Sequence, residues 1–139
     1  AEMIARRIKP DIAIVTDVTH DSSTPMINKI IEGDCSCGKG PSLCFGPAVH
    51  NKLLAFVQDA ADKNKIPYQL RTVSRSTGTD TESFAYSNDG CPSVLISIPL
   101  RYMHTTVEMI HKDDIENTIR LIYETLITLT PKTNMIYFK

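Results

Sequence analysis

The sequence predicts an α/β domain, because strand-like and helix-like segments alternate along its 139 residues. Two apolar runs, at residues 12–18 and 93–98, are rich in β-branched residues and are typical of buried strands. Two amphipathic segments, at residues 51–64 and 115–129, carry apolar residues at helical spacing. We therefore expect a sheet whose neighbouring strands are mostly joined through helices.

The composition is that of a single core-bearing domain. Its length suffices for one hydrophobic core, and 42% of its residues are hydrophobic. The 15 basic and 16 acidic residues leave a net charge of −1, which gives no support for a nucleic-acid or membrane-surface partner. No apolar run reaches the roughly 18 residues of a transmembrane helix, and the first residues lack a signal-peptide pattern. We expect a cytoplasmic protein without a membrane partner.

The elements of the first half follow from breaks in the apolar pattern. A helix at residues 1–9 is expected to stop at Pro10. The strand at residues 11–18 is expected to be central and covered on both faces, because its apolar character is nearly continuous. The shorter segments that follow are a polar loop at 19–25, an edge strand or helical turn at 26–31, and a glycine-rich loop with a strand at 42–45.

The second half contains the longer helices and the main core strand. The helix at residues 51–64 ends before Pro67, and the core strand at 93–98 is expected to break at Pro99. The last helix is expected to bury Ile115, Ile119, Leu121, Ile122, Leu126 and Leu129, and to stop at Pro131. The remaining segments are a strand at 68–73, a loop at 74–81, a short helix at 82–87, a turn at 88–90 and a tail at 133–139.

Four cysteines permit disulfides, but a domain with its own core favours reduced thiols. Cys35 and Cys37 are separated by one residue, which is poor spacing for a zinc knuckle. A protein built on thiols or on zinc would need Cys91 to approach the loop that holds Cys35, Cys37 and Cys44. The run Gly38-Lys39-Gly40-Pro41 lacks Walker A spacing, so we interpret it as a loop that precedes a strand.

Two residues predict half of a metal site. Asp17 and His104 both follow apolar strand signals, and strand ends are where binding groups collect in α/β proteins. Carboxylate and imidazole are metal ligands, but a catalytic zinc usually takes three protein ligands. Alternatively, Asp17 is a turn or cap residue and His104 a histidine bonded to a backbone carbonyl. Gly78-Thr79-Asp80 can equally be a turn followed by a helix cap.

Five segments resemble a known family in the same order along the chain. Thr16-Asp17-Val18-Thr19-His20 with Thr24-Pro25 resembles the "DVTH…TP" segment of the metal-dependent aminopeptidases that include the tetrahedral, glutamyl and deblocking enzymes. The other four segments are similar to "GKGP", "IPYQ", "GTD" and "IPxRYMHSPVE", and they begin here at Gly38, Ile66, Gly78 and Ile98.

The resemblance implies a function and a set of roles. It implies a dinuclear metal centre that removes N-terminal residues from peptides, with two divalent ions, zinc or cobalt. Asp17 would ligate one ion and His104 the other, while Thr79 and Asp80 would lie on the substrate side. It also implies a three-layer fold like that of the zinc exopeptidases, and a homo-oligomer for the complete protein.

The resemblance also implies that the chain is incomplete. The family's general-base and metal-binding glutamates would lie just upstream of Ala1, so residues 1–139 would be the C-terminal part of the catalytic domain. We expect this piece to be inactive alone, with none of its residues acting as the catalytic base. The alternative is a non-catalytic binding or assembly module of the same fold. An endoglucanase is disfavoured, because glycosidases use two facing carboxylates without a metal cage.

Overall fold

The computed structural model describes residues 1–137, which form a mixed sheet flanked by helices. The helices are α1 (Glu2–Ile8), α2 (Lys29–Glu32), α3 (Asn51–Lys63), α4 (Thr81–Ala85) and α5 (Lys112–Thr128). The strands are β1 (Ala13–His20), β2 (Ser42–Phe45), β3 (Gln69–Thr72), β4 (Ser93–Arg101) and β5 (Met109–Ile110). Within these residues, none of the helices has both the length and the apolar character needed to cross a membrane.

The sheet is organised around β4. In the described chain the strand order is β1-β4-β2-β3, and β5 pairs with the end of β4. β1 runs parallel to β4, and Asp17 lies opposite Ser97. β2 runs antiparallel to β4 and parallel to β3. The prediction that the first strand is central is wrong for this structure: β1 lies at an edge of the described sheet, and β4 lies between β1 and β2.

β4 continues through Pro99, where the sequence predicted a break. Pro99 pairs with Thr19 of β1, and the strand ends at Arg101. The carbonyl of Leu100 faces β1, where it accepts from the N–H of Asp21. The backbone of Pro99 therefore faces the other side, where the pairing with β2 has ended and that with β5 has not begun. A missing N–H breaks no ladder bond there, so proline is tolerated inside this strand.

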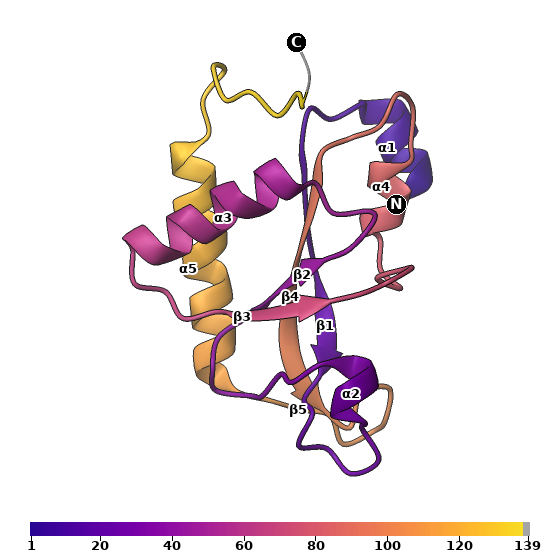
Figure 1. Cartoon of the computed structure of the whole chain (residues 1–139), viewed down its shortest axis with the longest axis vertical. Helices are drawn as coiled ribbons and strands as arrows, with labels where there is room; N and C mark the ends of the chain where they lie inside the picture. The colour runs from indigo at the N-terminus through magenta and orange to yellow at the C-terminus, as the bar shows by residue number, and fades with distance from the viewer. Residues whose placement is uncertain (138–139) are drawn as a thin grey trace.

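Helices cover both faces of the sheet, which confirms the predicted α/β class. Figure 1 shows α3 and α5 on one side of the strands and α1 and α4 on the other. The core joins the inner faces of α3 and α5 to β2 and β4. Its fully buried members include Leu43, Leu53, Leu54, Val57, Val94, Ile96 and Leu121.

The buried face of α5 differs from the prediction. Leu121 is buried as expected, but Ile119 and Leu126 are 61% and 52% exposed. Thr118 and Thr125 are buried instead, and their hydroxyls donate to helix carbonyls four residues earlier. Because these hydroxyls are satisfied within the helix, threonine can face the core at little cost.

The short elements show smaller differences. Of the two alternatives for residues 26–31, the helical turn is correct: they contain the start of α2, with Asn28 as its N-cap. β5 was not predicted, since two residues carry no periodic signal. The helix at residues 1–9 ends with Lys9 in the left-handed conformation before Pro10. Of the predicted tail, residues 138 and 139 lie outside the described residues.

Candidate functional site

Asp17 lies inside β1 rather than at its end. Side chains alternate along a strand, so Asp17 shares a face with Val15 and Thr19, and by register with Ser97. It is half-buried. One carboxylate oxygen accepts a hydrogen bond from the N–H of Val18 at 2.8 Å. The second oxygen makes no hydrogen bond within residues 1–137, so it is available to a cation.

His104 lies beyond β4, in an exposed turn. Its backbone adopts a left-handed conformation with φ 63°, and Tyr102 has φ 56°. Its N–H donates to a carboxylate oxygen of Glu108 at 2.6 Å. Within residues 1–137 the imidazole itself makes no hydrogen bond. The turn therefore presents the ring to solvent, with both ring nitrogens free to act as donor or ligand.

The structure does not bring these two residues into one metal site. Asp17 lies level with Ser97, and β4 runs on to Arg101, which places the strand end about 13 Å further along. Residues 1–137 contain no group of three or more metal-binding side chains close enough to hold an ion. Asp17 and His104 fit a divalent metal in the type of donor atom. They do not fit it in number, because a catalytic zinc takes three protein ligands.

Thr79 and Asp80 precede α4, and their side chains differ in hydrogen bonding. The hydroxyl of Thr79 lies 2.8 Å from the hydroxyls of both Thr77 and Thr81. Asp80 occupies the N-cap position but makes no side-chain capping bond, and its carboxylate is exposed. Thr79 is thus held in a local network, whereas Asp80 points its charge to solvent.

One polar face of the sheet connects β1 with the region around α4. Cys44 shares the face of Asp17, because Ser42 pairs with Ser97 and Cys44 follows two residues later. Burial raises the pKa of the Cys44 thiol, Arg71 acts to lower it, and Glu82 adds to the increase. Arg71 lies opposite Cys44 on the neighbouring strand β3. Arg71 also donates to the hydroxyl of Thr19 across the sheet.

A second feature, which the sequence interpretation underestimated, is the glycine-rich loop at residues 35–41. Side chains from three distant elements hold its backbone. Asp114 of α5 is fully buried and accepts from the N–H groups of Gly38 at 2.6 Å and Gly40 at 2.7 Å. Gln69 of β3 donates to the carbonyls of Ser36 and Gly40 and accepts from the N–H of Ser36. The "GKGP" and "IPYQ" segments are thus physically one unit.

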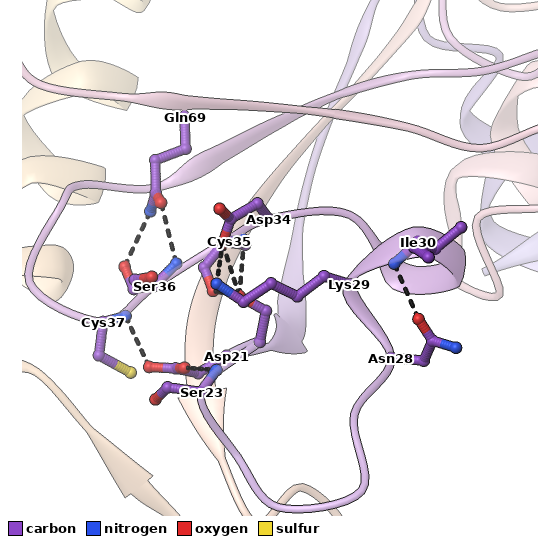
Figure 2. A network of polar contacts seen from close by, with 11 residues as sticks. Asp21, Ser23, Asn28, Lys29, Ile30, Asp34, Cys35, Ser36, Cys37 and Gln69 are labelled. Atoms are coloured by element: carbon purple, nitrogen blue, oxygen red, sulfur yellow. Dashed lines mark hydrogen bonds and ion pairs between the residues drawn. The ribbon is translucent and has the colours of Figure 1, made fainter.

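The third contact with this loop comes from Asp21, directly after β1. Its carboxylate accepts from the N–H groups of Ser23 at 2.6 Å and Cys37 at 2.8 Å, as Figure 2 shows. Burial favours a higher pKa for Asp21, but these hydrogen bonds outweigh burial and hold the pKa at about 2. The Cys37 thiol donates to the carbonyl of Pro99 at 3.4 Å. Burial and the neighbouring Asp21 raise the pKa of Cys37 to about 12.

The same network holds the projecting segment that contains α2. Lys29 forms an ion pair with Asp34 at 3.0 Å, and Asp34 accepts from the hydroxyl of Ser22. Figure 2 shows these contacts beside those of Asp21, so the loop after β1 and the loop before β2 are joined. Sequence reasoning had no signal for these pairs, because their partners are separated by loops without periodicity. The four cysteines are free thiols.

Comparison with known proteins places this geometry in a family. A model of the M42 glutamyl aminopeptidase family matches residues 1–121. A lysyl aminopeptidase of Pyrococcus furiosus is 35% identical over 131 residues, which cover 94% of this chain and 37% of that protein. The chain therefore spans little more than a third of the length of this curated relative.

Solved structures show the same similarity. A TET aminopeptidase from a marine sediment thaumarchaeote superposes with a TM-score of 0.85 at 33% identity, over 94% of this chain and 37% of that one. The TET1 peptidase of Pyrococcus horikoshii superposes with a TM-score of 0.71 at 27% identity, over 90% and 35%. That peptidase is described as assembling into a tetrahedron or a large octahedral shell.

Proposed function

The chain belongs to the M42 glutamyl aminopeptidase family, and from this premise we propose that it is the C-terminal part of the catalytic domain of a metal-dependent aminopeptidase. The observation that carries this proposal is the family match over residues 1–121, which includes every segment from Asp17 to His104. The TM-score of 0.85 to a TET aminopeptidase supports it, because that similarity covers 94% of the chain.

The proposed metal ligands of this chain are Asp17 and His104. In the complete enzyme each would bind one of two divalent ions, zinc or cobalt. Their free carboxylate oxygen and free imidazole support this role, and oxygen and nitrogen donors suit both metals. A bound divalent ion supplies Lewis-acid polarisation of the scissile carbonyl and makes water more acidic. Asp17 would hold its ion from a rigid strand, whereas His104 would approach from a turn.

The loop before α4 is the proposed substrate-binding element. Asp80 carries an exposed carboxylate that has no partner within residues 1–137, and such a group suits a cationic part of a peptide, such as its N-terminal ammonium. Thr79 lies beside it in the same loop. The proposed substrates are peptides with a free N-terminus, and the proposed location of the enzyme is the cytoplasm.

Two further points follow from the family. The chain alone would be inactive, because two donors are fewer than a catalytic zinc requires and the general base is expected from another segment. The complete protein is proposed to be a homo-oligomer. The TET1 peptidase of Pyrococcus horikoshii, which is described as assembling into a tetrahedron or a large octahedral shell, supports this proposal.

The test compares the 139-residue chain with the complete gene product, using aminoacyl and short peptide substrates with added zinc or cobalt. We expect hydrolysis by the complete protein only. Asp17→Asn and His104→Gln should each lower kcat/KM at least a hundredfold and lower the bound metal measured by atomic absorption. Thr16→Ser, an exposed neighbour on the opposite face, is the matched control. If the complete protein binds metal but hydrolyses nothing, the non-catalytic module becomes the better reading.

A further inference from the structure

Glu82, in the first turn of α4, holds the loop that precedes it. One carboxylate oxygen accepts from the N–H of Thr77 at 2.5 Å and from the hydroxyl of Ser76 at 3.2 Å. The other oxygen accepts from the hydroxyl of Thr77 at 2.6 Å. Burial favours a higher pKa for Glu82, but these hydrogen bonds hold the pKa below its ordinary value. At neutral pH the group is therefore ionised and can only accept.

An ionised Glu82 sets the direction of a chain of hydroxyl groups. Each threonine hydroxyl has one proton to donate. Thr77 gives its proton to Glu82, so the 2.8 Å contact between Thr77 and Thr79 requires Thr79 as the donor. The proton of Thr79 is then used, and the 2.8 Å contact with Thr81 requires Thr81 as the donor. The protons therefore point in sequence from Thr81 through Thr79 and Thr77 to Glu82.

With this direction of the hydrogen bonds, the hydroxyl of Thr79 can neither donate a hydrogen bond to a ligand nor accept one from it. Its proton goes to Thr77, and its oxygen accepts from the hydroxyl of Thr81 and, at 3.3 Å, from the N–H of Thr81. A hydroxyl oxygen accepts at most two hydrogen bonds, so Thr79 is saturated. Thr81 is fully buried at the start of α4, which packs against the sheet, and it fixes the last of the three hydrogen-bonded hydroxyls in place. Among the side chains of Thr79 and Asp80, only that of Asp80 has no hydrogen-bond partner within residues 1–137.

We infer that Glu82 is a positioning residue of the proposed aminopeptidase: through the three threonine hydroxyls it fixes the loop that presents Asp80, while Thr79 itself makes no substrate contact. This inference rests on the proposed function for the role of Asp80, but the hydroxyl chain stands on its own contacts. Gly78, with φ 70° and open space around it, gives the loop the freedom that Glu82 removes.

The first experiment tests the chain of hydroxyls without any activity. Amide shifts of Thr77, Thr79 and Thr81 are followed by NMR against pH in the 139-residue chain carrying Asp80→Asn, which removes the neighbouring carboxylate. We expect all three shifts to follow one midpoint, below the ordinary 4.5 of a glutamate. Glu82→Gln should abolish the transition at all three residues. A Thr79 shift that does not follow Glu82 would overturn the inference.

The second experiment uses the complete protein and measures KM and kcat separately. Glu82→Ala and Thr79→Val should each raise KM for a peptide about tenfold, with kcat changed less than twofold. Because Glu82 and Thr79 act through the same series of hydrogen-bonded hydroxyls, the KM of the double variant should equal that of either single variant. Glu82→Gln should recover most of the loss, and Ser83→Ala on the same helix is the control.

The outcomes separate this inference from the proposed function. A hundredfold rise in KM for the double variant would mean that Thr79 contacts the substrate independently, and would contradict the inference. An unchanged KM in Glu82→Ala would contradict it as well. If the unsubstituted protein hydrolyses nothing, the proposed function fails, whereas the NMR experiment still decides whether Glu82 orders the loop.

Discussion

The carboxylate of Asp114 accepts a hydrogen bond from the backbone N–H of Gly40 at 2.7 Å, although the two residues are 74 positions apart. The same carboxylate accepts from Gly38, so the last helix fixes the glycine-rich loop before β2. Because both Asp114 and Gly40 are buried, water cannot replace the bond between them. This contact explains why a carboxylate is found inside the core face of α5.

Replacing Asp114 by Asn should destabilise the chain. The amide oxygen can accept one of the two hydrogen bonds, but its NH₂ group would face the other N–H. We expect a loss of about 1–3 kcal/mol in the free energy of unfolding, as for a buried donor left without a partner. Urea denaturation followed by circular dichroism measures it. Asp113→Asn, whose side chain is 66% exposed, is the control and should change stability by less than about 0.5 kcal/mol.

Gly40 is the glycine of this loop that tolerates no side chain. It has φ 89°, and a Cβ atom there would overlap the carbonyl oxygen of Pro67. Gly78 also has a positive φ, but its Cβ would meet nothing within 4 Å. Gly78→Ala should therefore cost about 1–2 kcal/mol for the backbone alone. Gly40→Ala should cost clearly more in the same denaturation experiment, and equal costs would show that the loop can shift away from Pro67.

The sequence predicted the class of the fold and most elements, because long periodic segments such as residues 51–64 determine their own structure. It failed where long-range contacts override a local rule. Pro99 continues a strand, since its backbone faces a gap between two partners. Thr118 and Thr125 replace apolar residues on the buried face of α5, since they bond within the helix.

The candidate site was less predictable than the fold. The family segments pointed to Asp17 and His104, whose roles stay predictions, and the placement of Asp17 at a strand end was wrong. No local pattern marks Asp21, Asp114 or Glu82 as loop-holding groups, because their partners are set by tertiary structure. Only the resemblance of the "GKGP" and "IPYQ" segments to those of one family hinted that these loops matter.

The low pKa of Asp21 predicts a loss of stability in acid. Its pKa is about 2 in the folded chain and close to 3.9 when unfolded. A folded pKa below the unfolded one stabilises the chain above about pH 4, and this stabilisation is lost as pH falls toward 2. The expected loss is about 2 kcal/mol. Unfolding free energies measured from pH 5 to pH 2 should fall less steeply in Asp21→Asn, and parallel curves would refute the assignment.

The Cys37 thiol should be unreactive although it is only half-buried. Burial and Asp21 raise its pKa to about 12, and burial raises the pKa of Cys35 to about 11, so little thiolate exists at pH 8. We expect slow reaction of all four thiols with a disulfide reagent in the native chain and fast reaction in denaturant. Asp21→Asn removes the adjacent negative charge and the acceptor for the N–H of Cys37. It should therefore accelerate modification of Cys37, identified by mass spectrometry, more than that of Cys91, which lies far from Asp21 and serves as the internal control. A rapid native reaction at Cys37 would instead favour the reading in which the cysteines carry the function.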